Sequence, residues 1–198
     1  MKHTSIVSIF VTFVIMLLVI AINVLPVSAE EKGEKAAAGI SPKVEISFVY
    51  QRQTGMGSNQ FAVWIEDSSG RYIKTLYATR FTANGGWQKR PQSLPGWVKA
   101  SQALNIPSGE IDAITGATPS SGNLTYVWDC KDKAGNMVSA GEYRYFVEAT
   151  LRMDNRVIYS GMIKTGSQAQ ESQAASEFFG ESQQERGMIT NVAAKYYP

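Results

Sequence analysis

The stretch "IDAITGATPSSG" (Ile111–Gly122) concentrates residues that can take part in chemistry. It holds two threonines, two serines and an aspartate, and the strand-like run "LTYVWD" begins shortly after it. A hydroxyl among glycine and alanine can enter the active site of another enzyme, because its small neighbours do not obstruct it and the backbone can bend. The same composition is typical of an ordinary connection between strands. The sequence therefore offers two interpretations, a hydroxyl that receives a covalent group or a plain loop.

The rest of the chain excludes several classes of chemistry. The only histidine, His3, lies in the N-terminal apolar segment, so the remaining chain lacks the base for Ser-His or Cys-His catalysis and a histidine ligand for zinc. The only cysteine, Cys130, has no partner for an intramolecular disulfide. Asp129 and Asp132 lack the dense oxygen-ligand spacing of a calcium loop. We expect no catalytic residues and no metal site, and at most an electron carrier.

The N-terminus has the pattern of an exported protein. Lys2 precedes an uncharged apolar run, Ile6 to Leu25, and small residues stand at 27–29, where a signal peptidase reads the chain. This predicts a signal peptide over residues 1–29. The apolar run is also long enough to cross a bilayer, so an uncleaved anchor helix, which would keep the protein close to the membrane, is the competing interpretation. Either way, we expect a periplasmic or otherwise extracytoplasmic location.

The charge of the chain is nearly balanced, with 19 basic and 17 acidic residues. No basic stripe alternates with aromatic residues, so we expect no nucleic-acid partner. Residues 30–42 are charged and then small, which is typical of a flexible spacer.

Residues 43–198 have the pattern of one all-β domain. "VEISFVY" alternates apolar and polar residues, and the run from Tyr143 to Leu151 alternates most strictly, with Phe146 as its one exception. "DSSG" and "DKAG" supply turn residues, and we expect Asp67 and Asp132 to bond to their own backbone there. Further strands are expected at Phe61–Glu66, Tyr72–Thr79, Leu124–Asp129, 157–166 and 188–198. The spacing of these strands predicts an antiparallel β-sandwich with Trp64, Trp128 and Tyr143 in its core.

Two stretches are less regular. Leu94, Trp97, Val98 and Ser101 have helical spacing between prolines, which favours a short helix. Residues 166–187 are rich in Gln, Ser and Glu, and we interpret them as a mobile polar loop or insertion. The pair Phe178-Phe179 within this stretch can attach it to the sandwich.

"VWDCKDKAGNMVSAGEYRYFVEA" resembles the Ig-like domain of flagellar hook-capping proteins. Their pattern is Trp-Asp-Gly, then Asp-x-x-Gly, then a second glycine and a tyrosine before an alternating strand. The matching residues are Trp128, Asp129, Asp132, Gly135, Gly141 and Tyr143. Cys130 stands where the pattern has glycine. This resemblance implies an Ig-like sandwich.

The wider arrangement resembles a predicted periplasmic family, domain of unknown function 2271. It consists of "VWIEDSSGRYIKTL", Trp97, "DAITGAT" before the Trp-Asp strand, and a late strand that ends in proline. The resemblance covers Val44 to Pro198, and it implies export without assigning an activity. Proteins of this family are similar to proteins encoded near flavin-transfer and membrane redox systems.

"DAITGAT" is similar to the acceptor motif of proteins that carry covalent FMN, such as the flavin subunits of ion-pumping electron-transfer complexes. The matching residues are Asp112, Thr115, Gly116, Ala117 and Thr118. In that family a flavin transferase outside the cytoplasm joins the FMN phosphate to the last threonine, which here is Thr118. The resemblance therefore implies FMN as cofactor, and a flavin transferase and membrane redox proteins as partners.

Three functions remain open from the sequence. The first is an exported, non-catalytic Ig-like accessory of a membrane-associated redox system that carries FMN on Thr118 as an electron relay. The second is a structural or protein-binding Ig-like module without cofactor, which acts through edge strands or the 166–187 loop. The third is a carbohydrate-binding module that uses an exposed Trp87 or Trp97.

Overall fold

The computed structural model describes residues 41–54, 58–151, 155–180 and 187–198 of the chain. These residues belong to one compact unit, Ile40–Pro198. The predicted signal peptide or anchor and residues 30–40 of the predicted spacer lie outside the described residues, so these assignments stay predictions. Within the part of the chain that is described, no helix is long and apolar enough to cross a membrane.

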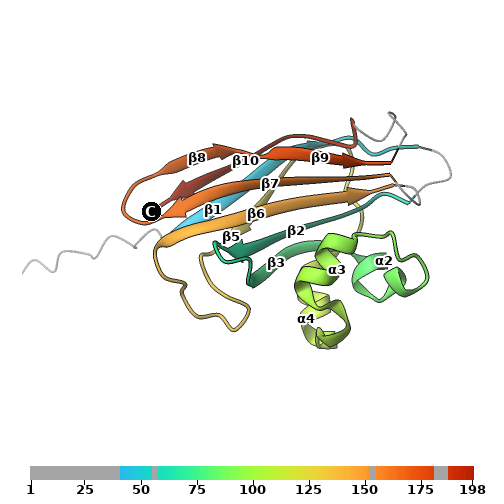
Figure 1. Ribbon diagram of the computed structural model, residues 1–198, viewed down its shortest axis with the longest axis horizontal. Coiled ribbons are helices and arrows are strands. Elements are labelled where there is room, and N and C mark those ends of the chain that lie inside the picture. The colour runs from blue at the N-terminus through green and yellow to red at the C-terminus, as the bar shows by residue number, and fades with distance from the viewer. Residues whose placement is uncertain (1–40, 55–57, 152–154, 181–186) are drawn as a thin grey trace, which may run out of the picture. The chain divides into compact units, whose positions relative to one another are not determined.

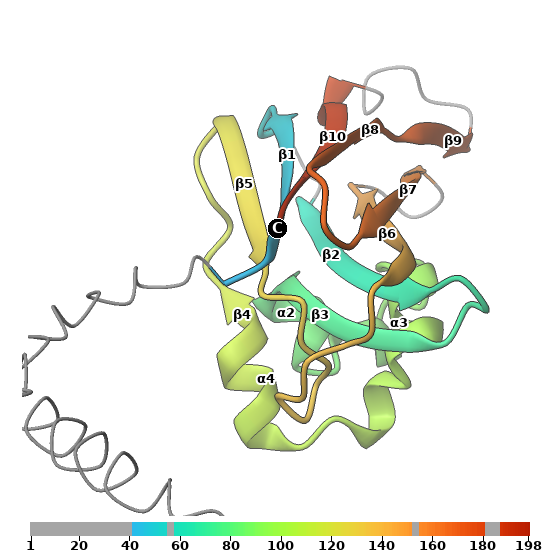
Figure 2. The ribbon, with the colours of Figure 1, turned by 90° about the vertical axis from the view of Figure 1, so that its left-hand side faces the viewer.

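Two β-sheets form the domain (Figures 1 and 2). The smaller sheet has the order β5-β1-β10-β8, with bounds Gly122–Trp128, Lys43–Tyr50, Ile189–Tyr197 and Gln170–Gln173. The larger sheet has the order β4-β3-β2-β6-β7-β9, with bounds Thr115–Gly116, Tyr72–Thr79, Gln60–Asp67, Gly141–Thr150, Arg156–Thr165 and Ala175–Phe179. All the strand pairs are antiparallel except β3 with β4. The predicted all-β sandwich is therefore confirmed.

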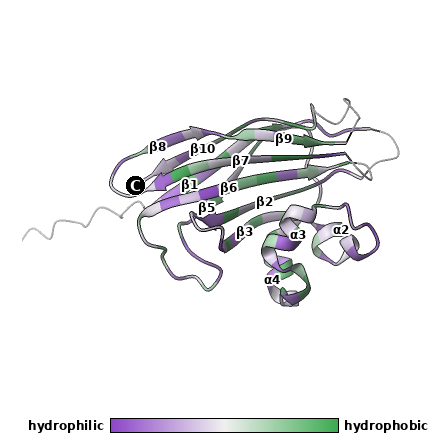
Figure 3. Cartoon of the chain, viewed as in Figure 1, coloured by the Kyte–Doolittle hydropathy of each residue, from purple (hydrophilic) through white to green (hydrophobic). Residues whose placement is uncertain are grey.

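The main core lies between the two sheets. Ile46 of β1 and Trp128 of β5 contribute from one sheet, and Val63 of β2 and Val147 of β6 contribute from the other; all four are fully buried. Side chains of a strand point alternately to its two faces, so each sheet can bury one face in this core. In Figure 3 the strands and helices each carry both hydrophobic and hydrophilic residues, as expected for elements with one buried side.

The structure explains why Phe146 interrupts the alternation of apolar and polar residues in strand β6. Tyr145 and Val147 point into the core between the sheets, as the alternation predicted. Phe146 points to the opposite face, where its ring stacks on Trp64 of β2 at a centroid distance of 4.7 Å. An apolar side chain fits there because this outer face is itself covered.

Short helices between β3 and β5 cover that outer face (Figure 1). They are α2, η1, α3, η2 and α4, with bounds Arg80–Ala83, Gly86–Gln88, Pro95–Ser101, Ala103–Asn105 and Ser108–Ile114, of which η1 and η2 are 3-10 turns. Helix α3 confirms the predicted short helix. Its Trp97 packs with Leu94, Ile114 and Trp64 in a second apolar cluster beneath the helices.

Buried polar groups also hold this helical layer. The side-chain oxygen of Gln60 accepts hydrogen bonds from the hydroxyls of Thr79 at 2.6 Å and Thr82 at 2.9 Å. The Thr82 hydroxyl lies 2.6 Å from that of Ser93. Because buried polar groups are costly unless they are paired, this chain of contacts fixes the start of the layer against β2 and β3.

The prediction of a polar loop over residues 166–187 is wrong for residues 170–173 and 175–179, and residues 181–186 lie outside the described residues. Gln170–Gln173 forms β8 on the edge of the smaller sheet, and Ala175–Phe179 forms β9 on the edge of the larger one. The chain changes sheets between them. Phe178 lies edge-on to Tyr159 at 6.5 Å, so the predicted attachment through the phenylalanine pair is confirmed. Both strands are largely exposed, which explains their polar sequence.

Candidate functional site

The segment singled out in the sequence contains regular structure that its composition did not predict. Asp112 belongs to helix α4, and Thr115 and Gly116 form strand β4. Only residues 117–121 run without helix or strand before β5 begins at Gly122. The plain-loop interpretation therefore holds for Thr118 and is wrong for the first half of the segment.

This segment carries the chain from one sheet to the other. Strand β4 is the edge of the larger sheet, and β5 is the edge of the smaller one (Figure 2). Thr115 pairs with Ala78 and Gly116 with Thr79 in a short parallel ladder against β3. Thr118 thus lies two residues after an edge strand whose register is set by β3.

Tyr77 of β3 fixes the backbone just before Thr118. Its hydroxyl donates to the carbonyl oxygen of Ala117 at 3.1 Å, and the carbonyl oxygen of Gly116 is a second, longer acceptor at 3.5 Å. A Cβ atom at position 116 would lie 3.0 Å from Cε2 of Tyr77. Glycine at 116 therefore has a steric reason in this fold, which is the close approach of an aromatic ring to the backbone.

The side chains of the predicted acceptor motif are not engaged elsewhere. Within the described residues, no hydrogen bond or ion pair involves the side chain of Asp112, Thr115 or Thr118. Thr118 is half-buried, and its neighbour Ala117 is exposed. The structure brings Thr115, Gly116 and Ala117 together next to Thr118, and it shows no hydrogen bond between Asp112 and Thr118.

Three tyrosines near this segment were not anticipated as part of a site. The ring of Tyr77 lies 4.9 Å from that of Tyr126 and 4.8 Å from that of Phe61, and Phe61 in turn lies 5.2 Å from Tyr50. The Tyr50 hydroxyl is buried and has no hydrogen-bond partner among the described residues. Burial raises the pKa of Tyr50 and of Tyr77 to about 12, so both phenols stay protonated near neutral pH. The only signal in the sequence is the position of these tyrosines on the inward face of β1, β3 and β5.

Two surface grooves lie away from the motif. One, of about 730 Å³, lies between the Asp67–Tyr72 and Asp132–Tyr143 regions. The other, of about 630 Å³, lies beside α3 over Tyr72 and Phe146. Neither groove is lined by residues 112–118. The acceptor segment therefore lies outside both grooves.

The tryptophans considered for carbohydrate binding do not form an exposed platform. Trp97 is completely buried, and its ring nitrogen donates to the hydroxyl of Thr75 at 2.9 Å. The prediction of Trp97 as an exposed sugar platform is therefore wrong, because α3 turns this side chain towards the sheet. Trp87 is half-buried.

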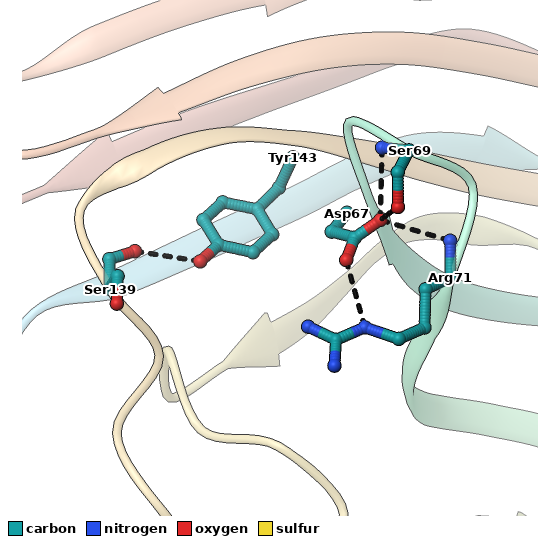
Figure 4. A network of polar contacts seen from close by, with 5 residues as sticks. All are labelled: Asp67, Ser69, Arg71, Ser139 and Tyr143. Carbon is teal, nitrogen blue, oxygen red and sulfur yellow. Dashed lines mark hydrogen bonds and ion pairs between the residues drawn. The ribbon is translucent and has the colours of Figure 1, made fainter.

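The aspartates interpreted as turn residues, Asp67 and Asp132, have that role. One carboxylate oxygen of Asp67 accepts hydrogen bonds from the backbone N–H groups of Ser69 and Arg71 and from the Ser69 hydroxyl (Figure 4). The other oxygen accepts from the Arg71 guanidinium at 2.9 Å. These donors, the Ser69 hydroxyl first among them, hold the pKa of Asp67 at about 2. Asp132 accepts the backbone N–H groups of Ala134 and Asn136 in the same way.

A metal site was not expected, and the described residues contain no group of three or more His, Cys, Asp or Glu side chains that could hold an ion.

One comparison with known proteins gives a match. A family model described as "Predicted periplasmic protein (DUF2271)" matches residues 42–181, which is more than half of the chain. No curated protein and no solved structure gives a significant match. The description of the family confirms the predicted location outside the cytoplasm.

Proposed function

The chain belongs to the DUF2271 family of predicted periplasmic proteins, and from that premise we propose that it is an exported, non-catalytic accessory of a membrane-associated redox system that carries FMN covalently on Thr118. The observation that carries this proposal is the placement of the motif. Its last threonine lies at the junction of two sheet edges, its hydroxyl has no partner among the described residues, and an exposed alanine precedes it.

The segment fits the requirements of a modification by another enzyme. A transferase must bring the hydroxyl of Thr118 into its own active site, so a surface segment with small neighbours is suitable. Gly116 and Ala117 are small, and the segment lines neither of the two grooves. A hydroxyl already bonded within the domain would have to break that bond first, and Thr118 has none among the described residues.

The covalent step is a phosphoryl transfer. The Oγ1 atom of Thr118 attacks the FMN phosphorus of FAD, one phosphoester bond forms, the phosphoanhydride bond breaks, and AMP leaves. A base of the transferase takes the hydroxyl proton. Bound FMN supplies one-electron and two-electron redox chemistry, whereas this chain supplies the hydroxyl and the rigid backbone that presents it.

The proposed partners follow from this chemistry. They are a flavin transferase outside the cytoplasm and membrane redox proteins that exchange electrons with the flavin. If the N-terminal segment is retained, it keeps the domain close to those membrane proteins.

The Ig-like part of the proposal has its own support. The hydroxyl of Tyr143 donates to the carbonyl oxygen of Ser139, four residues upstream, at 2.6 Å (Figure 4). Trp128 packs edge-on against the Tyr143 ring at 4.9 Å. A tyrosine whose hydroxyl returns to the backbone just upstream, as in the tyrosine corner, and a buried tryptophan are features of Ig-type sandwiches.

A second candidate is a protein-binding module without cofactor. Strand β5 is the outer strand of the smaller sheet, and its Val127 is 52% exposed. Edge strands can add a strand from a partner. This candidate predicts capture of a partner that is unchanged by Thr118→Ala and reduced by a proline substitution at Val127.

Intact mass after co-expression with a flavin transferase and export tests the flavin proposal. We expect a gain of one FMN less one water in the wild type and no gain in Thr118→Ala. Thr125→Ala, an exposed threonine on β5, is the matched control and should gain the full mass. A separate acceptor protein in the same cells verifies that the transferase is active. With that verified, an unchanged wild-type mass, or a gain that survives in Thr118→Ala, overturns the proposal.

A further inference from the structure

The backbone just before Thr118 is hydrogen-bonded to Tyr77 of β3. We infer that Tyr77 is a positioning residue for the flavin transfer, because it holds the backbone before Thr118 in the conformation that the transferase uses. The inference rests on the proposed function and adds that the folded domain, rather than an unfolded stretch carrying the motif, is the substrate.

The first observation is the pair of hydrogen bonds that fixes the backbone on the N-terminal side of Thr118. Within the part of the chain that the structure describes, the Tyr77 hydroxyl makes the only side-chain hydrogen bonds to residues 115–118, and its acceptors are the carbonyl oxygens of Gly116 and Ala117. The ring itself is buried, with 8% of its surface exposed, and packs against Phe61 and Tyr126. A hydroxyl on such a fixed ring gives the two carbonyl groups a fixed position.

The second observation is a hydrogen bond that fixes the segment on the C-terminal side of Thr118. The backbone N–H of Arg52, just after β1, donates to the hydroxyl oxygen of Ser121 at 2.9 Å. This leaves residues 118–120 between two attachments that come from different sheets. Pro119 restricts the backbone in the middle of that span, because its ring fixes φ.

The hydroxyl groups of Thr118 and Ser121 differ in their hydrogen bonding. The hydroxyl of Ser121 is engaged with Arg52, whereas that of Thr118 is free of hydrogen bonds to the described residues. A reacting group that is already held near its productive geometry loses less conformational freedom in the transition state. The transferase therefore meets Thr118 on a backbone that the domain has ordered in advance.

The sharpest test removes one hydroxyl and keeps the ring. Tyr77→Phe retains the packing on Phe61 and Tyr126 and loses the bond to Ala117. Because one neutral hydrogen bond is lost, we expect the initial rate of FMN attachment to fall about fivefold, which corresponds to about 1 kcal/mol. Tyr126→Phe is the matched control, because no hydrogen bond of its hydroxyl reaches the segment. Its rate should equal that of the wild type.

The experiment follows the intact mass of the exported domain over time with purified transferase and FAD. Amide hydrogen exchange at residues 116–118, in protein without flavin, is the second readout, and we expect faster exchange in Tyr77→Phe under conditions where urea unfolding shows that the domain is fully folded. If Tyr77→Phe does not fold, Ser121→Ala removes the hydrogen bond to Arg52 on the other side of Thr118. The same two measurements apply, and this variant should also slow the transfer.

The outcomes separate the two proposals. A wild type that gains no mass overturns the proposed function, and the present inference with it. A wild type that gains mass at the same rate as Tyr77→Phe overturns the positioning role and leaves the flavin proposal intact. A faster rate in Tyr77→Phe also overturns it, because the transferase would then have to release the segment from Tyr77.

Discussion

The carboxylate of Glu148 on β6 accepts the backbone N–H of Trp97 at 2.8 Å, and that of Gly96 at 3.1 Å. These are N–H groups of the first turn of α3, which otherwise have no acceptor within the helix. Leu94 stands at the N-cap position and has no side chain that can accept them. A strand residue about fifty positions further along the chain therefore caps this helix and joins it to the sheet.

Replacing Glu148 should destabilise the domain strongly. Its side chain is completely buried, and it also pairs with Arg156 at 3.2 Å. Glu148→Ala leaves two N–H groups and a guanidinium without their acceptor, and breaking a buried pair in this way costs about 3 kcal/mol. Urea unfolding measures the loss. Glu142→Ala, an exposed glutamate on the same strand, is the matched control and should change stability by less than about 0.5 kcal/mol.

Equal stabilities of the two glutamate variants would contradict the capping role of Glu148.

Replacement by alanine should have opposite effects at two helical glycines, because only Gly96 lies against Glu148. A Cβ atom at Gly96 would lie 2.9 Å from a carboxylate oxygen of Glu148, whereas one at Gly109 of α4 would meet no atom within 4 Å. Alanine gains about 0.5–1 kcal/mol over glycine in a helix. Gly109→Ala should therefore raise the free energy of unfolding by about that amount, and Gly96→Ala should lower it by about 1–2 kcal/mol because the buried carboxylate must move. Thermal unfolding of both variants checks this, and stabilisation by Gly96→Ala would show that the carboxylate moves at no cost.

The strands were predictable because their signal is local. In β6 the core residues Tyr143, Tyr145 and Val147 occupy alternate positions within one strand, so no knowledge of the partner strands was needed. In the helical layer only α3 gives a local signal, which is the helical spacing of its apolar residues between prolines. Helix α2 has four residues, and α3 obtains its cap from Glu148, which the sequence places in a different element.

Strands β8 and β9 were missed for a related reason. Both are edge strands with mostly exposed residues, so their polar sequence lacks the alternation that identifies a half-buried strand. At the candidate site, the proposal of Thr118 rests on the motif, which is local to the sequence. The role of Tyr77 depends on a contact between residues 40 positions apart, and a tyrosine on an alternating strand indicates only a core residue.

Tyr50→Phe should leave the domain as stable as the wild type or more stable by about 1 kcal/mol. Its buried hydroxyl has no partner among the described residues, so its removal relieves a desolvation penalty and breaks no bond there. Tyr159→Phe is the comparison, because the Tyr159 hydroxyl donates to the carbonyl oxygen of Ile189 at 2.7 Å. That variant should lose about 1 kcal/mol. Urea unfolding of both proteins distinguishes the cases, and a clear loss of stability in Tyr50→Phe would reveal a partner for that hydroxyl.

Asp67 should make stability depend on pH in the acidic range. Hydrogen bonds from Ser69 and Arg71 lower the pKa of Asp67 from 3.8 to about 2. A depressed pKa means that the folded state favours the carboxylate, so the contribution is complete above the unfolded pKa and disappears as the pH falls through the folded one. Solvent screening of the exposed Arg71 limits the contribution of Asp67 to the free energy of unfolding to about 1 kcal/mol.

The stability difference between the wild type and Asp67→Asn should therefore be constant from pH 7 to about 4 and shrink towards pH 2. Urea unfolding across this range checks it, and a difference that does not shrink would assign the effect to packing.

Cys130 occupies a backbone conformation that favours glycine. Its φ is 52°, in the left-handed region, and its side chain is 3% exposed. A residue with a side chain pays about 1 kcal/mol in that region, and the buried thiol regains a similar amount by contact with the core. Cys130→Gly should thus change the free energy of unfolding by less than about 1 kcal/mol. Cys130→Val should lower it by more than 2 kcal/mol, on the order of the strain expected when a β-branched residue is forced into a positive φ. Chemical unfolding of both variants under reducing conditions measures these effects. A valine variant as stable as the glycine variant would mean that the turn after Trp128 can relax to an extended conformation, and the side chain of Cys130 would then be retained for its packing alone.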